Sequence, residues 1–332
     1  MRHRVWLLGG LALVALAGPA RAEAIRIATT HASSSAPFLI AQDRGYFAAE
    51  GLAAELVYID AAGPITSAVV SGDVDFGATG LSAGFYNLAG RGVLRIIAGS
   101  IYEAAGFRGA TVVASNRAWD DGLRSFKDLG GHSIAVTQIG TPLHYTIGRL
   151  AETYGFDFKS VRIMPLQSFP NAVAAVSGGT TDAAVVAATY VMPALEHHEA
   201  QLLGFVGDAL PMQIGAVFVT TRTAETRGDT VRHFLAAFRR ATADYHHAFT
   251  GSDGRPAFQP GAEEIIDLLA EATRQTPEQV RAGIAYVDAD ARVYASDVKR
   301  QIAWYAAQGM VKADVDADAI IDRRYAITLP TP

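Results

Sequence analysis

Hydroxyl and amide side chains gather in five short segments, residues 30–37, 79–82, 138–142, 166–168 and 188–190. All five are rich in Ser, Thr, Gln or Gly, and none contains an acidic residue. Such side chains offer neutral hydrogen-bond donors to a polar or anionic group of a small molecule. The three serines of the first segment also suit plain helix capping, which Ser provides in many proteins. The segments therefore predict binding chemistry rather than catalysis.

Residues 80–84 read Gly-Leu-Ser-Ala-Gly and match the G-x-S-x-G pattern of a hydrolase nucleophile. No HGGG-type segment precedes them, and His246 and His247 lie inside a helical run rather than at a strand end. We interpret Ser82 as a hydroxyl at the start of a helix that donates to a ligand. A secreted serine hydrolase using Ser82 stays as the alternative from another functional class.

Other chemistries lack the residues they need. The chain has no cysteine, which excludes thiol nucleophiles, disulfides and cysteine-bound metals. The histidine pairs 197–198 and 246–247 are neighbours on expected helices, where successive side chains point about 100° apart and cannot grip one ion. A formal net charge of −5 without a basic block argues against nucleic-acid binding. We expect no catalytic residue, no metal and no cofactor.

The first 22 residues form a separate segment. A basic start, an apolar run of 14 residues and an Ala20-Arg21-Ala22 ending are typical of a secretory signal peptide. The run is shorter than the roughly 20 residues that span a membrane. We expect cleavage after Ala22 and no membrane anchor. The mature chain then has 25 basic and 33 acidic residues, net −8, which favours an exported, soluble monomer.

The binding segments lie between short β-branched runs and amphipathic stretches that alternate along the chain. A first series of expected strands covers residues 25–29, 53–59, 75–79, 94–101 and 110–115, with helices at 36–50, 64–72 and 82–90. A second has strands at 133–137, 161–166 and 182–187, with helices at 142–154, 171–177 and 190–199. A strand at 216–221 and helices at 224–249, 260–272, 276–285 and 294–309 follow. This order predicts an α/β fold of two lobes with mainly parallel sheets, linked near 115–132.

Several motifs occur in an order similar to that of a known family. They include GYFAAEGL at 45–52, SGDVDFGATG at 71–80, QIGTP at 138–142, AVAAVSGGTTDAAVV at 172–186 and RQIAWYAAQGMV at 300–311. The chain resembles the periplasmic substrate-binding proteins of ABC importers, in the nitrate/sulfonate/taurine-type group. The resemblance implies a type II-like, two-lobe binding protein with the ligand cleft between the lobes. Residues 23–113 and 217–332 would form lobe I, and residues 114–216 lobe II.

Ligands of open parallel sheets bind beyond the carboxyl ends of the strands, near helix N-termini. Thr141 matches the family's small hydroxyl after Gly, and it could contact ligand or only cap the helix that follows. Arg108 could pair with an anion or lie solvated at the surface. The expected ligand-binding residues are those of the polar segments and their flanking helices: Thr30, His31, Ser34, Ser35, Phe38, Gly80, Ser82, Gln138, Thr141, His144, Gln167, Thr189 and Tyr190.

The resemblance implies a receptor that captures a small solute, passes it to an ABC permease and performs no chemistry. The leading expected ligand is a small organic anion, a sulfonate or carboxylate and possibly aromatic. A neutral heteroaromatic, such as a thiamine-precursor pyrimidine, is the second expectation. Where the family often carries Asp-Pro, this chain has Thr189-Tyr190 after Ala188, which weakens the case for taurine itself.

Overall fold

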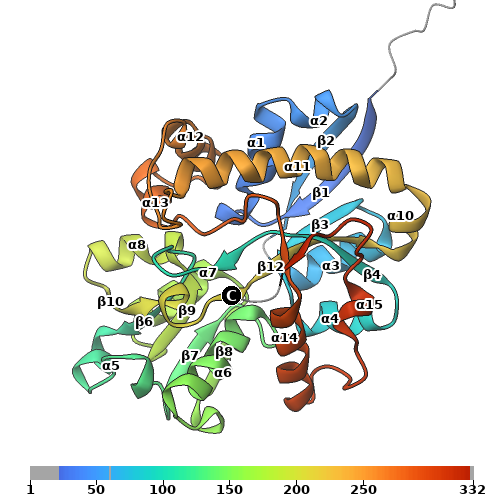
Figure 1. The fold of residues 1–332 in the computed structure, drawn as a ribbon. Coiled ribbons are helices and arrows are strands. Elements are labelled where there is room, and N and C mark those ends of the chain that lie inside the picture. The colour runs from blue at the N-terminus through green and yellow to red at the C-terminus, as the bar shows by residue number, and fades with distance from the viewer. Residues whose placement is uncertain (1–21, 60, 330–332) are drawn as a thin grey trace, which may run out of the picture.

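Two five-stranded sheets organise the computed structural model, which describes residues 22–59 and 61–329 (Figure 1). The expected signal peptide, apart from its last residue, lies outside these residues. The order in the first sheet is β2-β1-β3-β12-β4, with β2 Leu52–Tyr58, β1 Glu23–Thr29, β3 Phe76–Gly80, β12 Gly215–Thr220 and β4 Leu94–Gly99. The order in the second is β10-β6-β9-β7-β8, with β10 Ala200–Phe205, β6 Ala110–Ser115, β9 Ala183–Ala187, β7 Ser133–Val136 and β8 Arg162–Pro165.

Each sheet is parallel except for one strand. In the first sheet β12 runs antiparallel to β3 and β4, and in the second β6 runs antiparallel to β9 and β10. All residues of β7 and four of the five residues of β9 are buried, as expected of parallel strands covered on both faces. The predicted α/β fold with two mainly parallel sheets is therefore confirmed.

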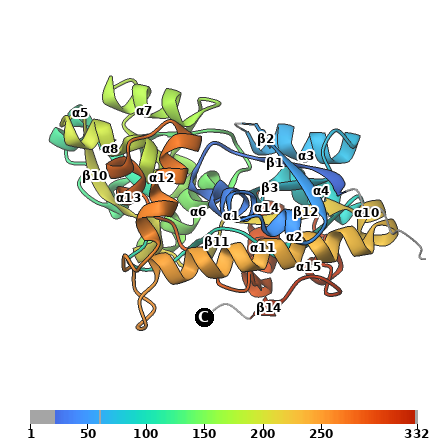
Figure 2. The ribbon, with the colours of Figure 1, turned by 90° about the horizontal axis from the view of Figure 1, so that it is seen from above.

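Helices cover both sheets. The first sheet carries α1 Ala36–Asp43, α2 Tyr46–Ala49, α3 Ala62–Ser71, α4 Ala83–Gly90, α10 Thr221–Thr226 and α11 Gly228–Phe249. The second carries α5 Asn116–Asp120, α6 Pro142–Tyr154, α7 Phe169–Ser177 and α8 Ala188–Glu196. The long helix α11 crosses one side of the molecule (Figures 1 and 2). Its apolar stripe is buried, and Phe234 stacks on Phe76 of β3 at 3.9 Å between ring centroids.

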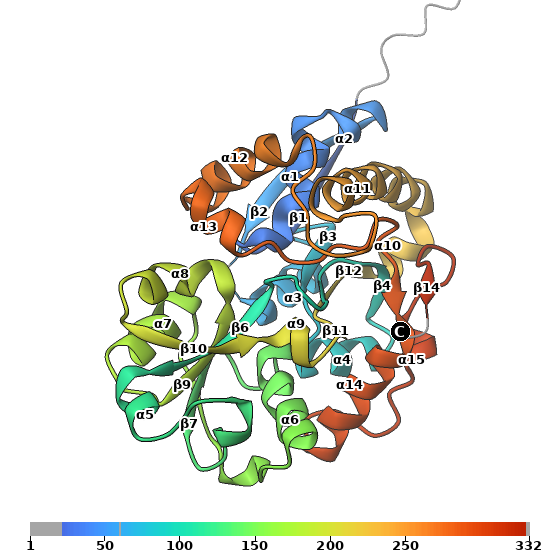
Figure 3. The same ribbon diagram turned by 60° about the vertical axis from the view of Figure 1, so that its left-hand side comes forward.

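The chain crosses between the sheets twice, and the crossings pair with each other. β5 (Tyr102–Glu103) follows β4, β11 (Met212–Gln213) precedes β12, and the two form an antiparallel ladder. The buried Asp297 Oδ2 accepts a hydrogen bond from the Gln213 amide at 2.6 Å, which ties this ladder to α14 (Ala295–Ala307). The connection is thus short and anchored, with α9 (Val206–Ala209) beside it (Figure 3).

The last part of the chain joins both units. Helices α12 (Ala262–Thr273) and α13 (Pro277–Ala282) lie above α8 in Figure 3, and α13 packs on α8. The backbone of Gly283 lies so close to Thr189 that an added Cβ would overlap it. Trp304 of α14 leaves equally little room at Gly148 of α6. The short elements α15 (Ala317–Ile320), β13 (Val293–Tyr294) and β14 (Thr328–Leu329) complete the fold.

Several sequence expectations differ from the structure, and the expected helix 224–249 is divided into α10 and α11 at Arg227. Residues 110–115 were expected in the first series of strands, but β6 pairs with β9 and β10 of the second sheet. The expected linker 115–132 instead forms α5 and a 3₁₀ turn with Leu123 and Leu129 fully buried, so it packs on the second sheet. The expected helix 36–50 breaks at Gly45, whose φ of 68° is left-handed.

Candidate functional site

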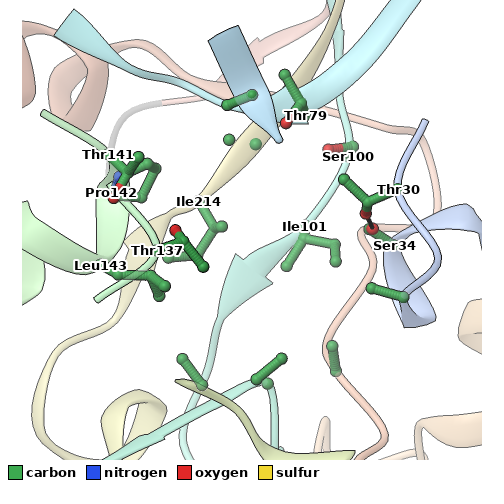
Figure 4. Close-up of a pocket in the computed structure, with 18 of the residues that line it drawn as sticks. Thr30, Ser34, Thr79, Ser100, Ile101, Thr137, Thr141, Pro142, Leu143 and Ile214 are labelled. Atoms are coloured by element: carbon green, nitrogen blue, oxygen red, sulfur yellow. Dashed lines mark hydrogen bonds between the residues drawn. The ribbon is translucent and has the colours of Figure 1, made fainter. Parts of the chain in front are cut away.

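A cavity of about 140 Å³ lies between the two sheets (Figure 4). Its wall takes residues from loops of the first sheet, from both crossings and from the second sheet. These loops follow the carboxyl ends of β1, β3, β7 and β9, the edge at which ligands of α/β sheets bind. Four of the expected ligand-binding residues line this cavity together, namely Thr30, Ser34, Gly80 and Thr141.

Hydroxyl groups supply most of the polarity of the cavity. The Thr30 and Ser34 hydroxyl oxygens lie 2.9 Å apart and share a hydrogen bond on one side (Figure 4). Thr79 and Ser100 also line the wall, and Thr137 lies across from them on the second sheet. Because hydroxyl groups both donate and accept hydrogen bonds, these side chains can bind either a donor or an acceptor atom of a ligand.

The start of helix α6 faces the cavity, because Thr141, Pro142 and Leu143 all line it. Thr141 is the N-cap residue by position, but its hydroxyl donates to the Gln138 carbonyl at 2.8 Å and no side chain caps the helix. The first-turn amides of Leu143 and His144 therefore lack a side-chain acceptor. A polar ligand group could fill that place, and the Thr141 hydroxyl itself does not cap the helix.

The remaining wall is apolar and carries no basic side chain. Ile101, Ile214 and Phe169 provide the bulk of it, with small alanines and glycines between them. Among the described residues that line the cavity, none is Lys, Arg or His. The one ionisable group of the described lining is Glu103 of β5. An anion here would depend on hydroxyls and the α6 amides alone.

Glu103 is only 2% exposed. Its Oε1 accepts a hydrogen bond from the Ala110 amide at 2.9 Å, while Oε2 makes no hydrogen bond. Burial raises the pKa of Glu103 to about 8, against the opposing effect of the Ala110 amide and, more weakly, that of Gly207. The nearby Asp208 carboxylate raises it further. A buried carboxyl oxygen without a partner is costly, so this position requires explanation.

A second hollow of about 430 Å³ adjoins the cavity and shares Thr30, Ala32 and Phe169 with it. Here the His31 ring stacks on Tyr58 at 4.3 Å, on the side of the first sheet. Tyr190 of α8 reaches across and donates a hydrogen bond to the His31 carbonyl at 2.6 Å. The two expected residues His31 and Tyr190 thus meet in the hollow beside the cavity and link the two sheets.

The structure places three expected residues of the first sheet away from the cavity. Phe38 is fully buried in the core and stacks on Phe238 at 4.8 Å. The Ser35 hydroxyl is buried and donates to the Ala32 carbonyl. The Ser82 hydroxyl accepts from the Phe85 amide at 3.2 Å as the N-cap of α4, and within the described chain it has no hydrogen bond to a histidine. The hydrolase alternative gains no support from this geometry.

Four expected residues of the second sheet also lie outside the lining. Gln138 and Gln167 contact each other at 3.4 Å near the surface. The His144 ring is buried between Phe158 and Trp304, where its Nδ1 accepts from the Gly140 amide. Burial lowers the pKa of His144 to about 4, so the ring is neutral. Thr189 is buried under Gly283.

Arg108 lies in an outer groove of about 400 Å³ rather than in the cavity. Its guanidinium stacks over the Phe205 ring at 5.2 Å from the centroid. Arg281 of the same groove pairs with Glu263 through two hydrogen bonds, at 2.7 and 2.6 Å. The surface reading of Arg108 fits this position.

Sequence reasoning missed several lining residues, including Ser100, Ile101, Glu103 and Ile214. All four lie at or beside the crossings between the sheets, whose paired strands are two residues long. Such short strands leave no periodic pattern to find. One sequence feature could have pointed to Glu103 as a functional residue. It is the one acidic residue in an otherwise uncharged run from residue 96 to 107.

Within residues 22–59 and 61–329, no group of three or more His, Asp or Glu side chains is placed to hold a metal ion. In the same residues, no helix has both the length and the apolar character to cross a membrane.

Comparison with solved structures shows the same fold at low sequence identity. The periplasmic aliphatic sulphonate-binding protein SsuA from Escherichia coli is 19% identical, with a TM-score of 0.71 over 91% of this chain and 98% of that one. A ligand-binding component of an ABC-type import system from Staphylococcus aureus, solved with zinc bound, is 12% identical, with a TM-score of 0.71 over 91% and 97%. The periplasmic nitrate-binding protein NrtA from Synechocystis PCC 6803 is 14% identical, with a TM-score of 0.66 over 92% and 86%.

No curated protein matches the sequence. The family model described as NMT1/THI5 like matches residues 32–248, which is more than half of the chain. The expected resemblance to sulfonate- and nitrate-type periplasmic binding proteins is confirmed by this family match together with the shared fold of the solved binding proteins. The chain therefore belongs to the NMT1/THI5-like family and has the fold of the periplasmic binding proteins.

Proposed function

We propose that this protein is an exported solute receptor that encloses one small organic molecule between its two lobes and delivers it to an ABC permease. The observation that carries the proposal is the cavity at the strand ends, lined from both sheets by hydroxyls and aliphatic side chains. Its volume of about 140 Å³ is below the roughly 300–1,000 Å³ of pockets for drug-sized ligands, which suits a small molecule. The hydrogen bond from Tyr190 to His31 would hold the lobes closed over it.

The lining favours the second of the two expected ligands, the neutral heteroaromatic, over the organic anion. A sulfonate or carboxylate would find the α6 amides and hydroxyls, but no cation in the described wall and one buried carboxyl instead. Ile101, Ile214 and Phe169 offer the apolar surfaces between which a flat ring packs well.

We also propose that each lobe is built on one sheet. The lobe limits expected after residues 113 and 216 then shift to the crossings, so that all of β6 belongs to lobe II and all of β12 belongs to lobe I. Cleavage after Ala22, residence in the periplasm and a monomeric state complete the proposal. Mass spectrometry of the exported protein tests the first, and sizing chromatography tests the last.

A thermal-shift screen over pyrimidines, aromatic carboxylates, sulfonates and nitrate tests the receptor function. A ligand at about 100 times its dissociation constant adds roughly 2.7 kcal/mol to the free energy of unfolding, which raises Tm measurably. Stabilisation by a pyrimidine supports the proposal. Stabilisation by sulfonates alone would instead favour an organic anion as the ligand. Turnover of a chromogenic ester that is lost in Ser82→Ala would instead support the hydrolase.

A further inference from the structure

Glu103 is the feature of the cavity that its neighbours leave unexplained. The side chain is 2% exposed, and Oε2 makes no hydrogen bond. No basic residue of the described chain forms an ion pair with it, and the other charged group that acts on it is Asp208, which is also acidic. Buried polar groups usually have a hydrogen-bond partner, so Oε2 could accept a donor that a ligand brings into the adjoining cavity.

Two backbone amides favour the ionised form of Glu103, although burial outweighs them and raises its pKa. The Ala110 amide donates to Oε1 at 2.9 Å, and the Gly207 amide also favours the charged form. The carboxyl lies against Gly109, where an added Cβ would overlap both of its oxygens. Glu103, Gly109 and Ala110 all line the same cavity, so the buried carboxyl lies beside it. The missing component is a positive partner, and the cavity is where one could enter.

We propose that Glu103 determines the specificity of the cavity by pairing with a basic nitrogen of the ligand, so that the ligand is a small organic cation or nitrogen base rather than an anion. This inference rests on the proposed function and narrows its heteroaromatic ligand to one with a basic nitrogen that is protonated in the complex. An amine, an amidine or a protonated ring nitrogen would each supply the N–H donor that Oε2 lacks. The apolar wall and the hydroxyls would hold the rest of the molecule.

Proton exchange follows from this pairing. With a pKa of about 8, Glu103 is mostly protonated at pH 7, and a cationic ligand must displace that proton to form the ion pair. Binding of a cation at pH 7 should therefore release most of one proton, whereas a neutral ligand should release almost none. The ligand-free protein should bind cations more tightly as the pH rises from 6 to 8.

Three molecules of nearly equal shape separate the possibilities. Benzamidine is a cation at pH 7, benzamide is neutral with an N–H donor, and benzoate is an anion without a donor. Calorimetric titration of the full mature chain should give affinities in that order, with benzamidine at least tenfold tighter than benzoate. Titration of benzamidine in two buffers of different ionisation enthalpy measures the proton released.

The Glu103→Gln variant keeps the shape of the side chain and an acceptor for the Ala110 amide. It should lose at least tenfold in benzamidine affinity, release no proton and bind benzamide as before. Asp297→Asn is the matched control, because this second buried carboxyl lies outside the cavity, and the order of the three probes should not change. Circular dichroism checks that both variants fold, and the wild-type proton count tests the inference without any variant.

Two results would overturn the inference. One is benzoate binding as tightly as benzamidine to the wild type, and the other is an unchanged order of affinities in Glu103→Gln. No measurable benzamidine binding at 20 mM would overturn it as well. In each case a hit elsewhere in the wider solute screen leaves the receptor function standing, whereas a screen without any hit overturns the receptor function itself.

Discussion

The free energy of unfolding should respond to pH through two buried groups that act in opposite directions. The pKa of Glu103 is about 8 in the folded protein, against 4.5 for an unperturbed side chain, so between these values only the folded state holds the proton. Stability should then fall with rising pH by about 1.4 kcal/mol per unit, or roughly 5 kcal/mol over the whole window.

His144 has the opposite sign. Its pKa is about 4 when folded and 6.5 when unperturbed, so between these values the unfolded chain binds the proton. Stability should rise with pH by about 1.4 kcal/mol per unit through this window and lose that gain as the pH falls. From about pH 4.5 to 6.5 the two slopes cancel, so the wild type should show little dependence on pH from these groups.

In each single variant, the free energy of unfolding should change with pH as the remaining group alone dictates. Glu103→Gln should become more stable as the pH rises from 4.5 to 6.5 and then level off. His144→Gln should lose stability steadily from pH 5 to 8. Urea unfolding followed by circular dichroism at pH 4.5, 5.5, 6.5 and 7.5 gives these slopes relative to the wild type. Variants that both keep the wild-type slope would refute the reasoning that burial sets these two pKa values.

Three further predictions concern the cavity and its closure. Thr141→Ala should weaken ligand binding about five- to tenfold by calorimetry, since a neutral hydrogen bond contributes about 1 kcal/mol. Thr226→Ala is the control, because it also loses only a hydroxyl bonded to a backbone carbonyl, and it should bind ligand normally. Equal affinities in the two variants would show that Thr141 does not contact the ligand. Tyr190→Phe loses the hydrogen bond to the His31 carbonyl and should release ligand about fivefold faster than the wild type in stopped-flow measurements. Tyr154→Phe, at an exposed position, is the control and should release ligand at the wild-type rate. Equal release rates in the two variants would contradict this role of Tyr190. Small-angle scattering should give a smaller radius of gyration with saturating ligand than without it in Tyr190→Phe, and identical radii would argue against closing lobes.

Local signals in the sequence predicted most of the fold. Pro142 at the first helical position and Gly155 after the last marked α6 at both ends, and the structure has the same bounds. The apolar runs of β7 and β9 were long enough to identify as strands. Residues 110–115 were assigned to the wrong sheet because strand pairing depends on which distant segment a strand meets, and its own residues do not record that.

The site was predicted in part for a similar reason. The polar loops predicted Thr30, Ser34 and Thr141 as ligand-binding residues, and all three line the cavity because strand ends gather at one edge. Which side chain of such a loop faces the cavity depends on the turn of the next helix, so Ser35 and Phe38, within four residues of Ser34, point into the core instead. Glu103 escaped notice because its burial arises from the pairing of β5 with β11, over 100 residues away.

A crystal structure of the protein with benzamidine, or with the best solute of the screen, tests the central claim most directly. The ligand should lie between the two sheets, in contact with the start of α6 on one side and with Thr30 and Ser34 on the other, and with a ligand nitrogen within hydrogen-bond distance of Glu103 Oε2. Ligand density in the outer groove beside Arg108 and Arg281, or against one sheet alone, would contradict it.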